Sequence, residues 1–288
     1  MKSNFISLEL FKKALQNGCQ KLIASYKQLN LINFFPVADS DTGTNMLLTI
    51  KEAFDRLEKD KSSSFNTLFD WFLDSVISSA QGNSGLIFSQ FFVSCQDFFS
   101  KKENESKVLL TVSDFQKILF LTEEKMKSVV VSPLLKGTMI FVMIEGNRKL
   151  SLECGTLKKN DFCSIFNLFL EGCQEGLEKT KFQLPVLKEN NVVDAGGKGL
   201  VVFFNGFYET ISRECCQKQG IDRDKNKVEK PKMIEIKKNN ETNQVSCSVK
   251  NNGCLNVLFL SKKKITLELK NQIKEKILQP EFSSVAFF

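Results

Sequence analysis

Apolar residues recur at helical spacing through the first 216 residues of the chain. Between Leu8 and Leu31, for example, large apolar side chains return every three or four positions, which places them on one face of a helix. Similar stripes, separated by turn residues, predict seven further helices. The eight predicted helices cover residues 8–31, 43–57, 65–77, 86–99, 113–130, 137 onward, 161–179 and 199–216. The pattern therefore predicts a mainly α protein.

The starts of alternate helices share an unusual composition. If eight helices run alternately up and down, the second, fourth, sixth and eighth begin at the same end. These four starts are rich in small and hydroxyl-bearing residues: Thr42-Gly43-Thr44-Asn45, Gly82-Asn83-Ser84, Gly137-Thr138 and Asp194-Ala195-Gly196-Gly197. Unpaired N–H groups at helix starts attract anions, and glycine lets a ligand approach the backbone closely. In that arrangement we expect an anion-attracting rim where the four starts meet, although plain capping could explain each start taken singly.

A pair of carboxylates precedes the second predicted helix. Asp39 and Asp41 lie two residues apart, in a stretch that Pro36 and Gly43 keep out of regular helix. In an extended backbone, side chains two residues apart point the same way, so both carboxylates can share one hard cation. Because the next helix start favours an anion, the pair indicates a Mg²⁺–nucleotide site. The alternative is an acidic turn in which Asp41 or Thr42 only caps the helix.

The pattern changes after the eighth helix. Residues 217–244 are rich in Lys, Asn, Asp and Glu, which is typical of a flexible charged linker. Alternation at 245–249 and an apolar run at 255–260 predict two strands, joined by a turn at 251–253 and followed by a helix at 266–278. The predicted organisation is a helical domain at 1–216, a linker at 217–244 and a small α+β segment at 245–288.

Composition and charge restrict the chemistry further. The 288 residues contain no histidine, which excludes His-based acid–base catalysis and His-ligated metals within them. Nine cysteines without a C-x-x-C pair argue against a disulfide framework and a zinc site. The net charge of +7 concentrates where aromatic residues are absent, so we expect no nucleic-acid partner. Without a long apolar run or a signal peptide, the expected location is the cytoplasm, with no membrane span.

Four stretches of the chain match motifs of a known family. The pattern Asn-Val-Phe-Pro-Val-Pro-Asp-Gly-Asp-Thr-Gly-Thr-Asn-Met appears as Asn33–Met46 with three changes, and Gly-Asn-Ser-Gly is intact at Gly82–Gly85. The stretches Leu184–Glu189 and Val192–Gly197 match without change. Over residues 1–212 the chain thus resembles the DhaL-type nucleotide-binding domain. This domain is shared by the ADP-forming subunit of dihydroxyacetone kinase and the ATP-binding subunit of bacterial fatty acid kinase, which is the closer match.

The resemblance implies an eight-helix antiparallel barrel that holds ATP and two Mg²⁺ ions at one end. By position, Asp39 and Asp41 would bind the metal, with Asn33 near the place of a third ligand. Residues implied to contact the nucleotide are Thr42, Gly43, Thr44, Asn45, Gly82, Asn83, Ser84, Thr138, Met139, Asp194, Ala195 and Gly196. The implied activity is a kinase subunit that phosphorylates a fatty acid carboxylate presented by a separate fatty-acid-binding protein. No residue is assigned to catalysis.

Some positions depart from the family pattern. Gln81 replaces an arginine before the Gly-Asn-Ser-Gly turn, and Lys136 replaces an acid before the sixth helix. The relatives continue into a larger middle domain, so we expect residues 245–288 to be a truncated remnant of it that would allow the chain to form a homodimer. These departures leave two alternatives: dihydroxyacetone (glycerone) kinase-like phosphotransfer, or a non-catalytic nucleotide-binding or regulatory module.

Overall fold

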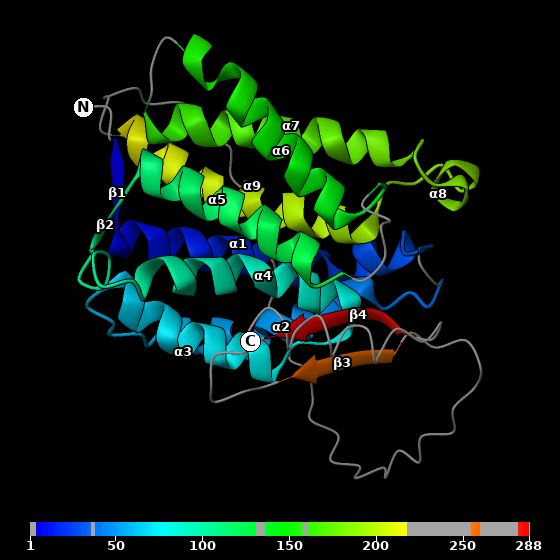
Figure 1. Ribbon diagram of the computed structural model, residues 1–288, viewed down its shortest axis with the longest axis horizontal. Helices are drawn as coiled ribbons and strands as arrows, with labels where there is room; N and C mark the ends of the chain where they lie inside the picture. Colours follow the sequence, from blue (N-terminus) through cyan, green and yellow to red (C-terminus); the bar gives the residue numbers. More distant parts are fainter. Residues whose placement is uncertain are drawn as a thin grey trace.

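Figure 1 shows the computed structural model of the chain. The structure describes residues 4–35, 38–130, 136–157, 161–217, 255–259 and 282–287. Most of the predictions for the C-terminal part fall outside the described residues. These are nearly all of the linker, the strand at 245–249, the turn at 251–253 and the helix at 266–278.

Eight long helices form a closed antiparallel ring in the described part of the chain (Figure 1). They are α1 (Leu8–Leu31), α2 (Thr42–Leu57), α3 (Phe65–Ser78), α4 (Gly82–Phe99), α5 (Val112–Ser128), α6 (Met139–Glu153), α7 (Phe162–Thr180) and α9 (Ala195–Gln217). Each long helix packs against the next along the chain, and α9 returns to pack against α1. This arrangement confirms the predicted barrel. No described helix is long and apolar enough to cross a membrane.

Glycines bring α1 and α9 close together where the ring closes. A Cβ atom on Gly18 would lie 2.9 Å from the carbonyl oxygen of Phe203, and one on Gly206 would lie 2.8 Å from that of Asn17. The Asn17 amide fills the remaining space by donating a 2.6 Å hydrogen bond to the Gly206 carbonyl. Larger residues at either glycine would push the two helices apart.

Phenylalanine rings fill the interior of the ring of helices. Fifteen phenylalanine side chains in the described residues are less than 2% exposed: Phe11, Phe65, Phe69, Phe72, Phe88, Phe91, Phe92, Phe99, Phe115, Phe162, Phe166, Phe169, Phe203, Phe204 and Phe207. Many rings meet edge to face, as Phe11 of α1 does with Phe65 of α3 and Phe207 of α9. Burial stabilises the fold by roughly 2–3 kcal/mol per ring, so these contacts hold the helices together.

One end of the barrel carries conventional helix caps. Ser7, Ser64, Thr111 and Asp161 each accept a hydrogen bond from a first-turn N–H group, and thereby cap α1, α3, α5 and α7. Two short strands, β1 (Phe5–Ser7) and β2 (Leu109–Thr111), pair antiparallel directly before α1 and α5. The starts of the remaining long helices therefore lie at the opposite end.

Several boundaries differ from the sequence prediction. Helices α4 and α9 begin four residues earlier than predicted, at Gly82 and Ala195, because their glycines form the first helical turn and do not precede it. A short helix, α8 (Pro185–Glu189), occupies a predicted loop, with proline at its favoured first position. A 3₁₀ turn (Cys154–Thr156) follows α6.

A second pair of strands lies in the C-terminal segment. Strand β3 (Leu255–Phe259) matches one of the two predicted strands. It pairs in parallel with β4 (Phe282–Phe287), a strand that the sequence reading missed. Parallel pairing joins segments far apart along the chain, and no local turn signal marks it.

Candidate functional site

Four helices begin at the end of the barrel opposite β1 and β2 (right-hand end of Figure 1). The start of α2 meets that of α4, since a Cβ atom on Gly82 would lie 2.5 Å from Nδ2 of Asn45. Met46 of α2 packs against Gly199 of α9. The start of α9 meets that of α6 through Gly196 and Met139, so the four predicted starts are brought together. We call this end the rim.

A buried amide holds the acidic loop of the rim. Asn33 is only 3% exposed, although it lies in the loop after α1. Its Nδ2 donates a 2.6 Å hydrogen bond to Oδ1 of Asp39, and its Oδ1 accepts a 2.9 Å hydrogen bond from Oγ1 of Thr42. The amide thereby fixes the exposed Asp39 carboxylate relative to the first residue of α2.

The Asp39 carboxylate lies close enough to Asp41 to raise the pKa of Asp41. Burial raises the pKa of Asp41 above its ordinary value, a hydrogen bond with Asn45 lowers it, and the neighbouring charge of Asp39 raises it again. Adjacent carboxylates with oxygen donors around them match the ligand preference of Mg²⁺. Within the described residues no three acidic or cysteine side chains gather into a metal cluster, so any ion here would be held by this pair, nearby amide and hydroxyl groups, water and ligand oxygens.

The first turn of α2 is pinned against α1. Oδ1 of Asn30 accepts a 3.1 Å hydrogen bond from the Thr44 N–H, and Nδ2 of Asn30 donates a 2.9 Å bond to Oγ1 of Thr44. A Cβ atom on Gly43 would collide with the carbonyl group of Tyr26, so only glycine fits there. The N-cap residue Asp41 makes no capping hydrogen bond, so the N–H groups of Thr42 and Gly43 remain for an anion.

The start of α4 is built in a similar way. Gly82 has a φ of +61°, a left-handed conformation that favours glycine, and no side chain caps the helix. Oγ1 of Thr49 accepts a 3.2 Å hydrogen bond from the Gln81 N–H, which ties the turn to α2. Ser84 reaches back to the Thr42 carbonyl at 3.5 Å. The starts of α2 and α4 thus form one rigid unit beside the acidic loop.

The starts of α6 and α9 are closed by a single carboxylate. Oδ2 of Asp194 accepts a 2.6 Å hydrogen bond from the Gly197 N–H, and the same carboxyl group accepts one from the Met139 N–H. Asp194 is only 6% exposed, and this burial raises its pKa to about 7 although both hydrogen bonds lower it. The sequence predicted that all four starts attract an external anion. The starts of α6 and α9 instead donate hydrogen bonds to the Asp194 carboxyl group of the chain itself.

The sequence-predicted site residues therefore separate into two groups. Those of α2 and α4, together with the acidic loop, surround one another. Met139, Asp194, Ala195 and Gly196 are buried under the other half of the rim, and Thr138 is partly exposed there.

Three residues that organise the rim were missed from the sequence. They are Asn30, Thr49 and Gln183, whose Oε1 accepts a 2.5 Å hydrogen bond from the Gly137 N–H. Each is a polar residue inside or just after a helix, where polar residues normally face water. The apolar faces of the helices give no signal for them.

Comparison with known proteins gives matches over the helical part of the chain. The family described as "DAK2 domain" matches residues 36–209. An uncharacterized protein of Mycoplasma genitalium is 35% identical over 211 residues, which cover 70% of this chain and 36% of the relative. An uncharacterized protein of Staphylococcus aureus is 32% identical over 213 residues, covering 73% and 37%. The chain thus spans about a third of the length of these relatives.

Solved structures share the fold. The dihydroxyacetone kinase from C. freundii, in complex with AMP-PNP and Mg²⁺, superposes with a TM-score of 0.51 at 18% sequence identity. The match covers 70% of this chain and 34% of that one. The native form of the same kinase gives a TM-score of 0.50.

Proposed function

Because the chain belongs to the DAK2 domain family, we propose that it is the nucleotide-binding part of a kinase and binds Mg²⁺–ATP at the rim. One observation carries this proposal: a pair of carboxylates lies beside two helix starts whose N-cap residues make no capping hydrogen bond. A Mg²⁺–triphosphate complex needs both features, since oxygen ligands hold the metal and backbone N–H groups hold the phosphates. The dihydroxyacetone kinase of similar fold was crystallised with AMP-PNP and Mg²⁺.

The residues of the rim have distinct proposed roles. Asp39 and Asp41 bind Mg²⁺, two ions by family resemblance, and Asn33 orients Asp39. The backbone N–H groups of Thr42 and Gly43 and those of the turn Gly82–Ser84 hold the phosphate oxygens. When held by these carboxylates, Mg²⁺ would supply charge neutralisation for phosphoryl transfer. This division of labour suits a chain without histidine.

The second half of the rim has a supporting role in this proposal. Thr138 and Met139 border the base and ribose, and the turn Asp194–Gly196 closes the site behind them. Since Asp194 is buried and hydrogen-bonded to two backbone N–H groups, it positions these helix starts and does not touch the ligand.

We propose a fatty acid carboxylate as the phosphoryl acceptor, presented by a separate fatty-acid-binding protein. The motif match at Asn33–Met46 supports this acceptor. Phenylalanine rings pack the barrel interior, so we expect an acyl chain to bind outside it. An acyl acceptor must then be delivered to the rim from outside.

Calorimetry tests the nucleotide proposal. ATP should bind to the purified chain with Mg²⁺ present and bind at least about tenfold more weakly with EDTA. No heat of binding at millimolar ATP would overturn it. The acceptor is tested separately by phosphoryl transfer with a purified fatty-acid-binding protein loaded with fatty acid, and in parallel with dihydroxyacetone and its own partner subunit. Phosphoryl transfer to dihydroxyacetone but not to the fatty acid would show that dihydroxyacetone is the acceptor.

Gln81 favours a second candidate, a nucleotide-binding module without catalysis. Its exposed side chain precedes the uncapped start of α4, where the resembled family has an arginine that could face phosphate. A neutral amide there removes charge stabilisation from phosphoryl transfer while leaving backbone phosphate binding intact. This candidate predicts Mg²⁺-dependent ATP binding with no transfer to either acceptor. Gln81→Arg would then be expected to strengthen ATP binding.

A further inference from the structure

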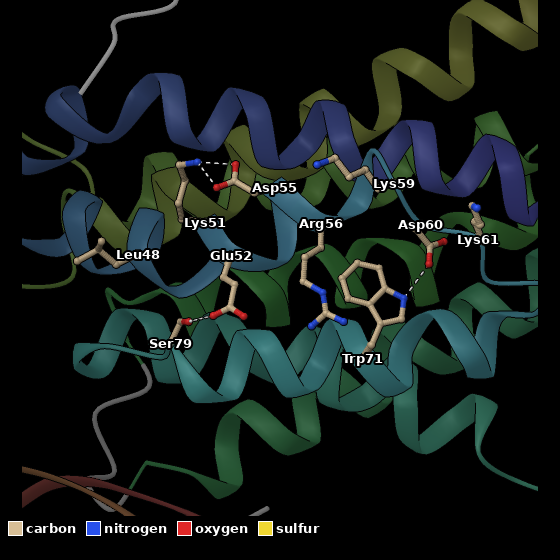
Figure 2. Close-up of a pocket in the computed structure, with 10 residues that line it drawn as sticks. All are labelled: Leu48, Lys51, Glu52, Asp55, Arg56, Lys59, Asp60, Lys61, Trp71 and Ser79. Carbon is tan, nitrogen blue, oxygen red and sulfur yellow. Dashed lines mark hydrogen bonds and ion pairs between the residues drawn. The ribbon is translucent and has the colours of Figure 1, made fainter. Parts of the chain in front are cut away.

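A groove of about 710 Å³ runs along the outer face of the barrel between α2 and α3 (Figure 2). Its lining comes from the outward face of α2, the turn after it and Trp71 of α3. Although α2 also contributes to the rim, the groove faces outward along the side of the barrel and contains none of the proposed nucleotide or metal ligands. It has no role in the proposed function.

Trp71 is held rigidly in the wall of this groove. Its Nε1 donates hydrogen bonds to Oδ1 of Asp60 at 2.8 Å and to Oγ of Ser62 at 3.1 Å. The guanidinium group of Arg56 lies 4.7 Å from the centre of the indole ring, and its NH1 donates a 2.8 Å hydrogen bond to Oγ of Ser75. Figure 2 shows the two side chains together, with the Arg56 guanidinium group beside the ring.

The acidic residues of the groove are largely neutralised by other residues. Asp60 pairs at 2.9 Å with Lys12, which reaches it from α1 and is only 10% exposed in its side chain. Burial raises the pKa of Asp60, but hydrogen bonds from Ser62, Lys12 and Trp71 outweigh it and keep the pKa below its ordinary value. Asp55 pairs with Lys51 at 2.5 Å. Both acids therefore carry their own counter-charge.

A cationic surface remains after these pairs are accounted for. Arg56, Lys59 and Lys61 line the groove, against a single remaining acid, Glu52, which accepts a hydrogen bond from Ser79 nearer the rim. In the part of the chain that the structure describes, neither Lys59 nor Lys61 has an ion pair or side-chain hydrogen bond. Their positive charges face solvent beside a rigid aromatic wall.

We propose that this groove binds an acidic segment of a partner protein. Carboxylates of the segment pair with Lys59, Lys61 and the unused N–H groups of Arg56, and an apolar side chain between them rests on Trp71. The groove is far larger than one phosphate ion requires. Nucleic acid fits less well, because Arg56 already covers one face of the ring and a single aromatic provides no run of stacking platforms.

Trp71 is the only tryptophan of the chain, so its fluorescence reports on this groove directly. The probe is a short peptide rich in Glu and Asp with one central Leu, added to the full chain at low salt. We expect a saturable change in Trp71 fluorescence whose affinity falls as salt rises, because exposed charges are screened. No fluorescence change up to millimolar peptide would overturn the proposal.

Charge reversal with a matched control locates the site. The double variant Lys59→Glu with Lys61→Glu should weaken peptide binding at least about tenfold. The control, Lys101→Glu with Lys102→Glu, makes the same change in net charge in the exposed turn after α4 and should leave peptide binding unchanged. Equal weakening by both pairs would show non-specific attraction and contradict the proposal.

Two further measurements complete the test. The neutral pair Lys59→Gln with Lys61→Gln should weaken binding in the same direction, so the result does not depend on whether the reversed pair folds. Single-stranded DNA of equal charge should bind more weakly than the peptide. Tighter binding of DNA would show that the groove binds nucleic acid and not an acidic protein segment. Mg²⁺-dependent ATP binding should be the same in the Gln pair and the unmodified chain. Because the peptide assay does not involve ATP, failure here leaves the rim proposal untouched.

Discussion

Asp39 and Asp41 are the single residues on which metal-dependent binding at the rim should depend. Replacing either with alanine removes a charged oxygen ligand, so each variant should lose Mg²⁺-dependent ATP binding by at least about tenfold. Asp39 is exposed and Asp41 partly so, and the unfolding free energy should therefore change by only about 0.5 kcal/mol. Calorimetry with and without Mg²⁺ measures the first effect and thermal unfolding the second. Asp55→Ala, an exposed carboxylate further along α2, is the control. Full Mg²⁺-dependent ATP binding in both variants would show that the metal binds to other residues.

Asp194 should make the stability of the barrel depend on pH. Its pKa of about 7 in the fold exceeds the ordinary value of 3.8, so the folded chain keeps this proton to higher pH than the unfolded chain. The free energy of unfolding should therefore fall as pH rises from about 4 to 7 and level off above that range, by about 2 kcal/mol between pH 5 and 8. Asp194→Asn cannot titrate and should lack this decline. Urea unfolding of both proteins at pH 5 and 8 measures the difference, and parallel profiles would exclude this role.

Residue chemistry made part of the rim predictable. The acidic pair and the glycines were found because carboxylates two residues apart and glycine-rich turns are visible in a linear pattern. The buried amide of Asn30 and the hydroxyl of Thr49 were not, because each acts on a residue that only folding brings near. The shared capping by Asp194 was hidden for the same reason, since Met139 lies 55 positions before it in the chain.

At the scale of elements, the joint between α2 and α4 should be sensitive to the loss of one glycine. Gly82→Ala places a Cβ atom on a residue with a φ of +61° and 2.5 Å from Nδ2 of Asn45. The left-handed backbone alone costs about 1–2 kcal/mol, and the contact displaces Asn45 as well. We expect lower thermal stability and roughly tenfold weaker ATP binding, because the phosphate-binding turn moves.

Gly155→Ala is the matched control for this joint. Nothing lies within 4 Å of a Cβ atom at Gly155, and the residue is exposed. Unfolding and ATP binding should stay close to those of the unmodified chain. If Gly82→Ala behaved in the same way, the two helix starts would not act as a rigid unit.

Helix existence was easier to predict than helix boundaries. Long apolar stripes identified all eight long helices, because each must bury one face against its neighbours. The sequence reading placed α4 and α9 too late, since glycine was treated as a breaker where it instead forms a first turn. The strands β1 and β2, of three residues each, are too short to show a period of two.

At the scale of the whole molecule, the helical barrel should be separable from the residues that follow it. All proposed nucleotide ligands lie before Gly197, and α9 ends at Gln217. A chain cut after Gln217 should keep its helical circular dichroism signal and its Mg²⁺-dependent ATP affinity. A chain cut after Gly199 should unfold, because it loses Phe203, Phe204 and Phe207 from the core. Loss of the helical signal in the first truncation would show that the C-terminal segment belongs to the same folding unit.

The barrel was expected from the family resemblance, and its helices follow one another in space in the same order as along the chain. Alternating direction then decides which helix starts share an end, without any knowledge of side-chain packing. The pairing of β3 with β4 could not be predicted from the order of elements, because more than twenty residues separate the two strands along the chain. The predicted homodimer and the location in the cytoplasm remain predictions.

The contact between α1 and α9 has a consequence for how the molecule folds. Every other neighbouring pair of long helices can form as a local hairpin, whereas this pair must join the first helix to the last across about 180 residues. Loop-closure entropy makes such a contact slow to form, so it should appear late on the folding pathway. The N-terminal end of α1 and the C-terminal end of α9 lie at the same end of the barrel. A short peptide could therefore connect them. A circularly permuted chain that opens between two other helices should then fold to the same barrel, with a different pair of helices closing last.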